Sequence, residues 1–385
     1  MQLKFSKHQI IEVKEIMTGL MLWLVLILLT YNSYLCSSVC NGERNSTDVI
    51  VVLGQKKHSS YDASHSTSLE PILSSLETHY SFVKEADILI WHEGDLNESD
   101  ISFVKYKNNI RFCRVDTSGG WGNRKNVPAE KLRMWHVGYL KMIRFYAVTI
   151  WSILDNLGYK WMIRFDDDSR LLSDIKYNIF DFMRTNNKSY GYRTISRECG
   201  STGTFNKFVT EYINNKRLVG REVKNYCHEI GSLGYYNNFY ITNISWWLSE
   251  SVVSFTQAFD ISNLIFTQRD NDLIFQTAAV NLFLESNKIM HFTDWSYLHH
   301  TIRFGKVLWG GMDISYNDKE ASRKIHSYVS KFHMQHIVLC EFESEGQRAK
   351  LIFVTNDPTC PYCNGTSTEL DLKNLSRTLD SIWYR

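Results

Sequence analysis

The segment YKWMIRFDDD, residues 159–168, places three aspartates directly after a hydrophobic run. A mostly apolar run that ends in a polar turn predicts a buried strand from Tyr159 to Phe165. On extended backbone, side chains two residues apart point to the same side, so Asp166 and Asp168 are expected to face one ion. Carboxylates at the carboxyl end of a strand are typical of ligand sites in open α/β sheets. The alternative is an acidic, solvated turn.

Apolar runs before this segment predict the rest of a sheet. They are DVIVVLG at residues 48–54, ADILIWHEGDL at residues 86–96 and IRFCRV at residues 110–115. A helix with one apolar face is expected between the first two runs, and a longer helical pattern covers residues 137–157. Unbroken apolar strands alternating with helices are typical of a sheet covered on both faces. The sequence therefore predicts an α/β fold whose mixed, mostly parallel sheet is flanked by helices.

The N-terminal region contains a candidate membrane anchor. Residues 16–36, IMTGLMLWLVLILLTYNSYLC, carry no charge, and a helix of about 20 apolar residues spans a bilayer. Lys4, Lys7 and Lys14 precede the run, which favours a cytosolic N-terminus. We expect a cytosolic tail at residues 1–15, a transmembrane helix at 16–36, a short stem at 37–47 and one luminal domain at 48–385. A cleaved signal peptide is the alternative.

Two features fit an oxidising luminal compartment. N-glycosylation triplets begin at six asparagines, all after the apolar run: Asn45, Asn97, Asn187, Asn243, Asn364 and Asn374. The chain also contains eight cysteines, an even number that suggests disulfides whose pairing the sequence does not reveal. Cys360 and Cys363 have the spacing of a zinc or redox pair, and without a second such pair we expect a disulfide between them. Golgi or endoplasmic reticulum membranes are the expected location.

The overall composition is that of a folded protein with a core. Of the 385 residues, 44% are hydrophobic and 22% are charged. The formal net charge is only +2, so no long-range field attracts nucleic acid, and we expect no nucleic-acid partner.

Several blocks in order resemble one known family. They are Tyr139 to Phe145, Trp161 to Asp168, Asp174 to Tyr177, Asn238 to Ile241, Asn271 to Leu284 and Tyr297 to His299. Their order and spacing are similar to those of the fungal α-1,2-mannosyltransferases, glycosyltransferase family 15. The resemblance implies a GT-A-type fold and a metal-dependent glycosyltransferase. It also implies GDP-mannose as the nucleotide-sugar donor, a glycan or glycoprotein acceptor, and retention of the sugar configuration.

The resemblance also implies roles for individual residues. Asp166 and His299 match metal ligands, Asp168 matches the family aspartate at the metal and donor, and their mixed oxygen and nitrogen set suits Mn²⁺. Tyr139, Arg144 and Arg164 match residues at the donor, and the arginines suit a diphosphate. Asp272 matches an aspartate that binds sugar hydroxyls or the acceptor. Ordinary alternatives remain, since arginines also pair with aspartates and tyrosines usually pack.

Tyr240 departs from the family pattern. It stands where the family has a glutamate proposed as the nucleophile or as the group that stabilises an oxocarbenium-like state. A tyrosine is neutral near pH 7 and does not supply the same charge. We expect Tyr240 to act as a catalytic residue that lines the donor-sugar pocket beside Asp272. Two rival functions remain, a transferase with another nucleotide sugar and an inactive luminal glycan-binding protein.

Overall fold

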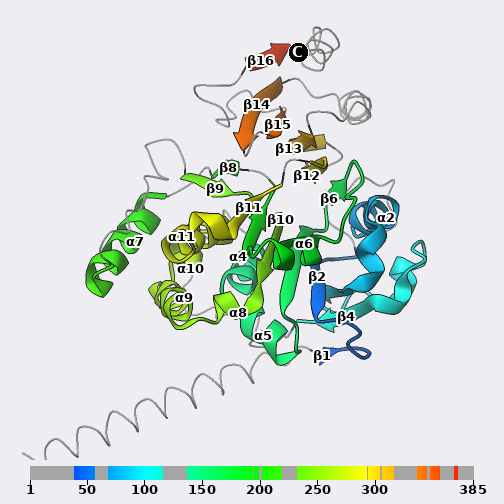
Figure 1. Ribbon diagram of the computed structural model, residues 1–385, viewed down its shortest axis with the longest axis horizontal. Coiled ribbons are helices and arrows are strands. Elements are labelled where there is room, and N and C mark those ends of the chain that lie inside the picture. The colour runs from blue at the N-terminus through cyan, green and yellow to red at the C-terminus, as the bar shows by residue number, and fades with distance from the viewer. Residues whose placement is uncertain are drawn as a thin grey trace, which may run out of the picture.

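The computed structural model describes most of the folded body and places it in two layered parts (Figure 1). The described residues are 39–56, 68–115, 137–193, 195–198, 202–218, 232–292, 294–303, 306–315, 336–344, 347–355 and 368–371. The expected cytosolic tail, the transmembrane helix at residues 16–36 and the Cys360–Cys363 pair lie outside these residues. Their predicted structure is therefore not tested by the fold.

An eight-stranded mixed sheet forms the centre of the larger part, in the order β1-β4-β3-β2-β5-β10-β7-β11. β2, β3, β4 and β5 are mutually parallel, β10 is antiparallel to β5 and β7, and β11 is parallel to β7. The strands are β1 Val39–Cys40, β2 Asp48–Leu53, β3 Asp87–His92, β4 Ile110–Arg114, β5 Trp161–Asp166, β7 Tyr190–Tyr192, β10 Phe239–Asn243 and β11 Ile289–His291. The apolar runs of the sequence thus form the predicted strands β2, β3, β4 and β5.

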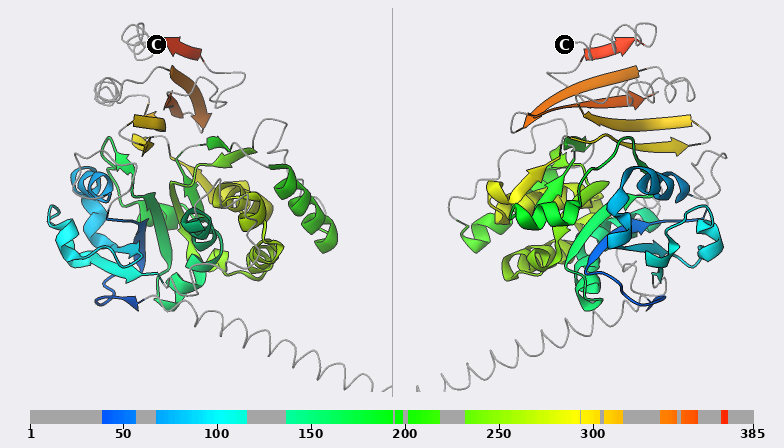
Figure 2. Two further views of the ribbon diagram at one scale, coloured as in Figure 1. Left: turned by 180° about the vertical axis from the view of Figure 1, so that it is seen from behind. Right: turned by 45° about the vertical axis from the view of Figure 1, so that its right-hand side comes forward.

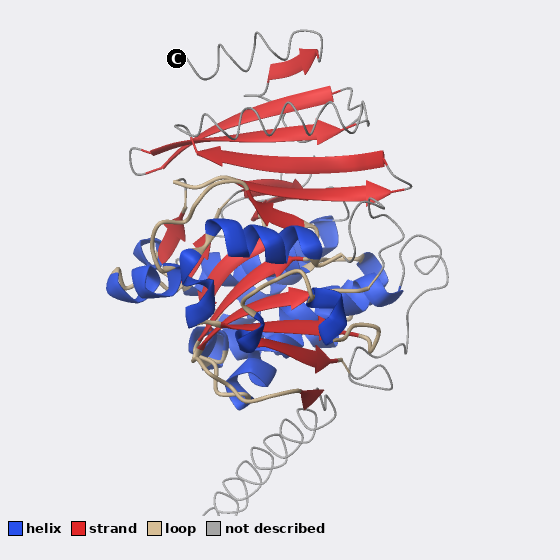
Figure 3. Cartoon of the chain, turned by 90° about the vertical axis from the view of Figure 1, so that its right-hand side faces the viewer, coloured by secondary structure: helices blue, strands red, loops and turns tan. Residues whose placement is uncertain are grey.

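Both faces of this sheet are covered, which explains why its strands are apolar throughout. On one face Val49 and Val51 pack into a core with α4, α5, α9 and α11. On the other face Ile50 and Val52 pack with α2 and α6. Figure 3 shows helices in front of and behind the strands. The helices are α2 Glu70–His79, α4 Val137–Arg144, α5 Ile150–Asn156, α6 Ile179–Thr185, α7 Thr202–Lys216, α8 Ile244–Trp247, α9 Glu250–Ser262, α10 Leu264–Gln268 and α11 Asp272–Phe283.

The long helical pattern predicted at residues 137–157 is interrupted by a π-helical turn. α4 and α5 are joined by η4, Phe145–Thr149, which has π geometry. The combined stretch Val137–Asn156 is long and apolar enough to cross a membrane by length and composition, and half of it is buried inside the fold. Its buried side chains belong to the core beneath the central sheet, as expected for a core helix.

A second, antiparallel sheet lies above the first part (Figure 2). Its six strands have the order β16-β14-β15-β13-β12-β6. They are β6 Ser169–Leu171, β12 Tyr297–Arg303, β13 Lys306–Ser315, β14 His336–Ser344, β15 Gln347–Thr355 and β16 Thr368–Asp371. A short ribbon pairs β8, Ile195–Glu198, with β9, Ser232–Tyr235. β6 follows β5 almost directly, so it links the two sheets. This second sheet was not predicted from the sequence.

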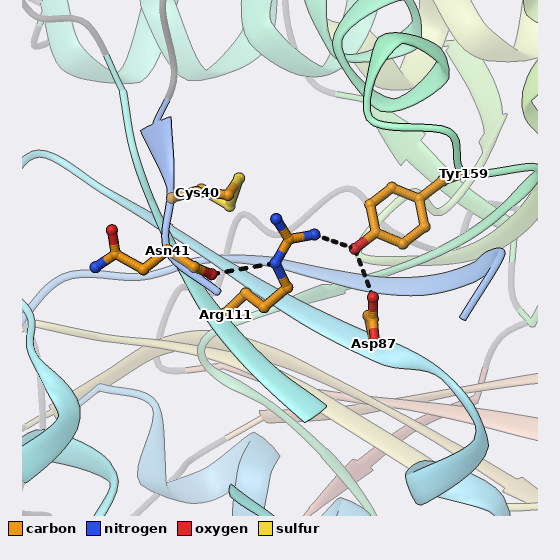
Figure 4. Close-up of a disulfide and its surroundings, with 6 residues drawn as sticks. Cys40, Asn41, Asp87, Arg111 and Tyr159 are labelled. Atoms are coloured by element: carbon orange, nitrogen blue, oxygen red, sulfur yellow. Dashed lines mark hydrogen bonds between the residues drawn. A yellow bond between two sulfur atoms is a disulfide. The ribbon is translucent and has the colours of Figure 1, made fainter. Parts of the chain in front are cut away.

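The N-terminal edge of the body begins earlier than predicted. A disulfide joins Cys40 on β1 to Cys113 on β4, and β1 pairs with β4. Nearby, the Arg111 guanidinium donates to the Asn41 carbonyl at 3.1 Å and to the Tyr159 hydroxyl at 2.8 Å (Figure 4). Val39 and Cys40 fall within the predicted stem at residues 37–47, so that boundary is corrected: the folded domain includes residues before 48.

Replacing both cysteines of this disulfide by serine is expected to lower the free energy of unfolding. The bridge closes a loop with a sequence separation of 73 residues, and such a cross-link stabilises by restricting the unfolded chain. We expect a loss of about 2–4 kcal/mol, measured by urea unfolding of the double variant. An unchanged unfolding midpoint would contradict this role of the bridge.

Candidate active site

Two aspartates and a histidine meet at the junction of the two sheets. Asp166 ends β5 and Asp168 lies in the turn before β6. β12 pairs with β6 so that His299 lies opposite Ser169. The His299 Nε2 atom lies 3.1 Å from Asp168 Oδ1 and 3.7 Å from Asp166 Oδ2. Residues far apart in the sequence therefore converge at one point, as predicted.

This cluster fits a divalent cation by its donor set. Its three ligand atoms all lie within 4.8 Å of one another. Neighbouring ligands of an octahedral ion are about 3 Å apart when each lies about 2.1 Å from the metal. Two carboxylates and one imidazole suit first-row ions such as Mn²⁺. The three donors leave further coordination positions for substrate oxygens.

Burial and charge shift the pKa values of two of these groups. Burial raises the pKa of the Asp166 carboxyl, although the Arg164 guanidinium opposes the shift. Burial lowers the pKa of His299, but the Asp168 and Asp166 carboxylates outweigh burial, and its pKa is raised. Both shifts favour the protonated forms, so metal binding at this cluster should weaken as the pH falls.

Tyr236 fixes the orientation of the histidine. Its hydroxyl lies 2.8 Å from His299 Nδ1, and both side chains are buried. The tautomer that binds a metal through Nε2 carries its hydrogen on Nδ1, which then donates to the Tyr236 oxygen. Tyr236 was not predicted from the sequence, because a tyrosine next to another tyrosine has no metal-site signature.

Replacing Tyr236 by phenylalanine is expected to weaken Mn²⁺ binding about tenfold or more, because hydrogen-bond partners of ligands contribute on this scale. The measurement is a calorimetric or electron paramagnetic titration with Mn²⁺. Tyr106→Phe is the matched control, because the buried Tyr106 hydroxyl donates instead to the Leu73 carbonyl, at 2.6 Å. Equal Mn²⁺ affinity in the Tyr236 variant and the wild type would rule out this positioning role.

Arg164 links the metal cluster to α11 by hydrogen bonds to Asp166 and Asp272. Its Nε donates to Asp166 Oδ1 at 2.8 Å, and its Nη1 donates to Asp272 Oδ2 at 2.6 Å. The guanidinium carbon lies 3.6 Å from the centre of the Tyr146 ring. Because the Arg164 side chain is only 3% exposed, the predicted contact with a diphosphate is not supported. Its structural alternative, pairing with aspartates, is what the geometry shows.

Asp272 is the first residue of α11, where a negative charge interacts favourably with the helix dipole. Asn271 precedes it and caps the helix by accepting from the Ile274 N–H at 3.1 Å. Through Arg164, Asp272 is coupled to the metal cluster. Its predicted role with sugar hydroxyls or the acceptor stays a prediction.

The other two predicted donor-binding residues have partners on neighbouring helices and loops. Arg144 makes a bidentate ion pair with Asp260 on α9, with both N–O distances 2.7 Å. This pair is the ordinary alternative for Arg144, and its contact with a diphosphate stays a prediction. The Tyr139 hydroxyl accepts from Arg269 Nη2 at 2.9 Å, and the Arg269 guanidinium also lies near its ring. Tyr139 is partly exposed and near the chain that leads into Asp272, so its donor-site role stays a prediction.

Tyr240 does not lie where the sequence predicted it. Its side chain is 0% exposed and belongs to the core. The ring stacks on Tyr190 and lies beside Trp151, while its hydroxyl accepts from Gln276 Nε2 at 3.3 Å. The prediction that Tyr240 lines the donor-sugar pocket is therefore wrong. The cause is the register: Tyr240 lies opposite Arg164 on the buried face of β10, where a large ring fills the core.

Known proteins with similar sequences are fungal mannosyltransferases. The probable mannosyltransferase KTR3 of Saccharomyces cerevisiae is 30% identical over 178 residues, which are 43% of this chain and 42% of that protein. The glycolipid 2-alpha-mannosyltransferase 2 of Candida albicans is 27% identical over 202 residues, which are 48% of this chain and 42% of that protein. The chain thus spans about two fifths of the length of the curated relatives it matches.

Two solved structures share the fold. Core-mannan synthase A from Aspergillus fumigatus, in a Mn/GDP form, has a TM-score of 0.56 at 14% identity and covers 66% of this chain and 74% of its own. The mannosyltransferase Ktr4p from Saccharomyces cerevisiae in complex with GDP has a TM-score of 0.55 at 18% identity and covers 71% and 81%. This likeness confirms the predicted GT-A-type fold.

The sequence signature of one family covers more than half of the chain. The family is described as glycolipid 2-alpha-mannosyltransferase, and its signature matches residues 97–304 of the 385. The match includes Asp166, Asp168, Asp272 and His299. The chain therefore belongs to the glycolipid 2-alpha-mannosyltransferase family, glycosyltransferase family 15.

Proposed function

We propose that the protein is a Mn²⁺-dependent α-1,2-mannosyltransferase that moves mannose from GDP-mannose to a glycan or glycoprotein. The observation that carries this proposal is the meeting of Asp166, Asp168 and His299. They lie at the strand ends where open α/β sheets bind ligands, in a member of this family. The Mn/GDP form of a protein with the same fold adds support for both the ion and the nucleotide.

The chain's own residues supply binding and orientation. Asp166, Asp168 and His299 would hold the ion, and Tyr236 would keep the imidazole aligned. When bound, a divalent cation neutralises the negative charge that develops on the departing diphosphate. Arg164 pairs with both Asp166 and Asp272, which supplies a counter-charge and holds the two carboxylates in place.

Retention of the sugar configuration is proposed without a protein nucleophile. Tyr240 is enclosed in the core, and burial raises the pKa of its phenol, which therefore stays neutral. We propose instead that the acceptor hydroxyl attacks from the face that the diphosphate leaves. The proton of that hydroxyl then passes to the departing diphosphate oxygen, so charge and atoms balance.

We also propose a single-pass anchor at residues 16–36 with the catalytic domain in the Golgi lumen. The glycosylation triplets after the apolar run favour this topology. The Cys40–Cys113 disulfide is in keeping with an oxidising compartment.

A donor screen tests the proposed activity. Purified protein is incubated with Mn²⁺ and a series of GDP- and UDP-sugars, and release of the nucleoside diphosphate is measured with and without a mannoside acceptor. Among the nucleotide sugars, we expect only GDP-mannose to release its nucleoside diphosphate. We expect the acceptor to increase this release and EDTA to stop it. Turnover of a UDP-sugar would favour a transferase with another donor.

An inactive glycan-binding protein is the second candidate function. The observation that favours it is Tyr240, which replaces the family glutamate and is buried. This candidate predicts mannoside binding with no turnover of any nucleotide sugar. The same screen, combined with calorimetric titration of mannosides, separates the two functions.

A further inference from the structure

One buried amide beside the metal cluster lacks a hydrogen-bond partner. Asn238 is 2% exposed, yet the described residues offer no acceptor to its Nδ2 atom. Asn109 shows the usual arrangement, because its buried Nδ2 donates to the Val83 and Ala86 carbonyls, at 2.9 and 2.5 Å. A buried donor without an acceptor is unfavourable and calls for an explanation such as water or a ligand.

The strand register places Asn238 directly beside Asp166. β10 pairs with β5 so that Tyr240 lies opposite Arg164 and Phe239 opposite Phe165. One step further, the Asp166 N–H donates to the Asn238 carbonyl at 3.1 Å. Side chains of directly opposed residues are about 5 Å apart at Cβ. Asn238 and Asp166 are therefore cross-strand neighbours at the same strand end.

The turn that contains Asn238 borders the cluster on two sides. Two residues earlier, Tyr236 contacts His299, while Asn238 adjoins Asp166. The Nδ2 atom of the adjacent Asn237 also lacks an acceptor among the described residues.

We propose that Asn238 is a substrate-binding residue whose Nδ2 donates to an oxygen of the nucleotide sugar held at the Asp166–Asp168–His299 cluster. This inference rests on the proposed function. An amide N–H₂ group complements an acceptor oxygen, and both the diphosphate and the hexose hydroxyls supply such atoms. Binding of the donor would give the buried amide the partner that it lacks in the protein alone.

The test compares Asn238→Ala with Asn109→Ala. Thermal unfolding is measured without ligand, and the dissociation constants of GDP and GDP-mannose are measured with Mn²⁺. We expect Asn238→Ala to leave the melting temperature nearly unchanged, because its Nδ2 atom has no hydrogen bond to lose among the described residues. We expect its affinity for the donor to fall, by about tenfold or more if the acceptor is a charged phosphate oxygen and by less if it is a neutral hydroxyl. Asn109→Ala should lower the melting temperature and keep the wild-type affinity.

The two ligands identify the contacted oxygen. A weaker affinity for both GDP and GDP-mannose indicates the nucleoside diphosphate, whereas a weaker affinity for GDP-mannose alone indicates the hexose. The inference is overturned if Asn238→Ala binds both ligands like the wild type, or if it lowers the melting temperature as Asn109→Ala does. If the wild type itself binds no GDP with Mn²⁺, the proposed function fails as well, so the two failures are distinguishable.

Discussion

Replacing Asp168 by alanine is expected to abolish sugar transfer and Mn²⁺ binding while the protein stays folded. Asp168 Oδ1 lies 3.1 Å from His299 Nε2, closer than Asp166 Oδ2 at 3.7 Å. Losing a ligand should cost more than losing a ligand's hydrogen-bond partner, so we expect Mn²⁺ affinity to fall more than about 100-fold. Asp168 lies in a turn outside both cores, so the melting temperature without metal should change little.

The measurement is an Mn²⁺ titration of the purified variant, followed by the donor assay at saturating Mn²⁺. Asp174→Ala is the matched control, because Asp174 lies on the same segment, and its exposed carboxylate pairs with His79 at 2.8 Å. The control should bind Mn²⁺ like the wild type. Wild-type Mn²⁺ affinity in Asp168→Ala would show that the cluster is not the metal site.

The sequence predicted the parallel half of the fold well because its strands are buried on both faces. Unbroken apolar runs such as residues 48–54 leave little choice about where a strand lies. β10 was harder to place, because the sequence does not show that it runs antiparallel to β5. The two-residue β1 depends on a disulfide to Cys113, and cysteine pairing cannot be read from one sequence.

The candidate site was predictable in its ligands and not in their surroundings. The aspartates follow a strand, and the family resemblance supplied His299. The partners of Arg164 and Arg144 were not predictable, because Asp272 and Asp260 lie 108 and 116 residues further along the chain. Nothing in the sequence alone shows whether a guanidinium meets an acidic side chain or a substrate.

The packing of Tyr240 was also not predictable from the sequence. Its alignment with a family glutamate suggested a catalytic group, but position in a motif does not determine which way a larger side chain packs. On β10 it shares the face of Arg164, and Trp151, Tyr190 and Gln276 surround it. A neutral ring is compatible with that core, where an uncompensated carboxylate would be costly.

Replacing Arg164 by methionine is expected to destabilise the protein by about 3–5 kcal/mol, the usual cost of removing one partner of a buried ion pair. Arg164 donates to both Asp166 and Asp272, and the Asp272 side chain is only 7% exposed. Without the guanidinium, two neighbouring carboxylates lose their counter-charge. The loss of unfolding free energy is measured by urea denaturation at neutral pH.

Arg144→Met is the matched control for Arg164→Met. Arg144 also makes a bidentate pair, with Asp260, but the two side chains are 21% and 29% exposed. Solvent screens this pair, so its loss should cost only about 1 kcal/mol. Equal destabilisation by the two substitutions would mean that Arg164 does not balance buried charge, since only Arg164 pairs with a buried carboxylate, that of Asp272.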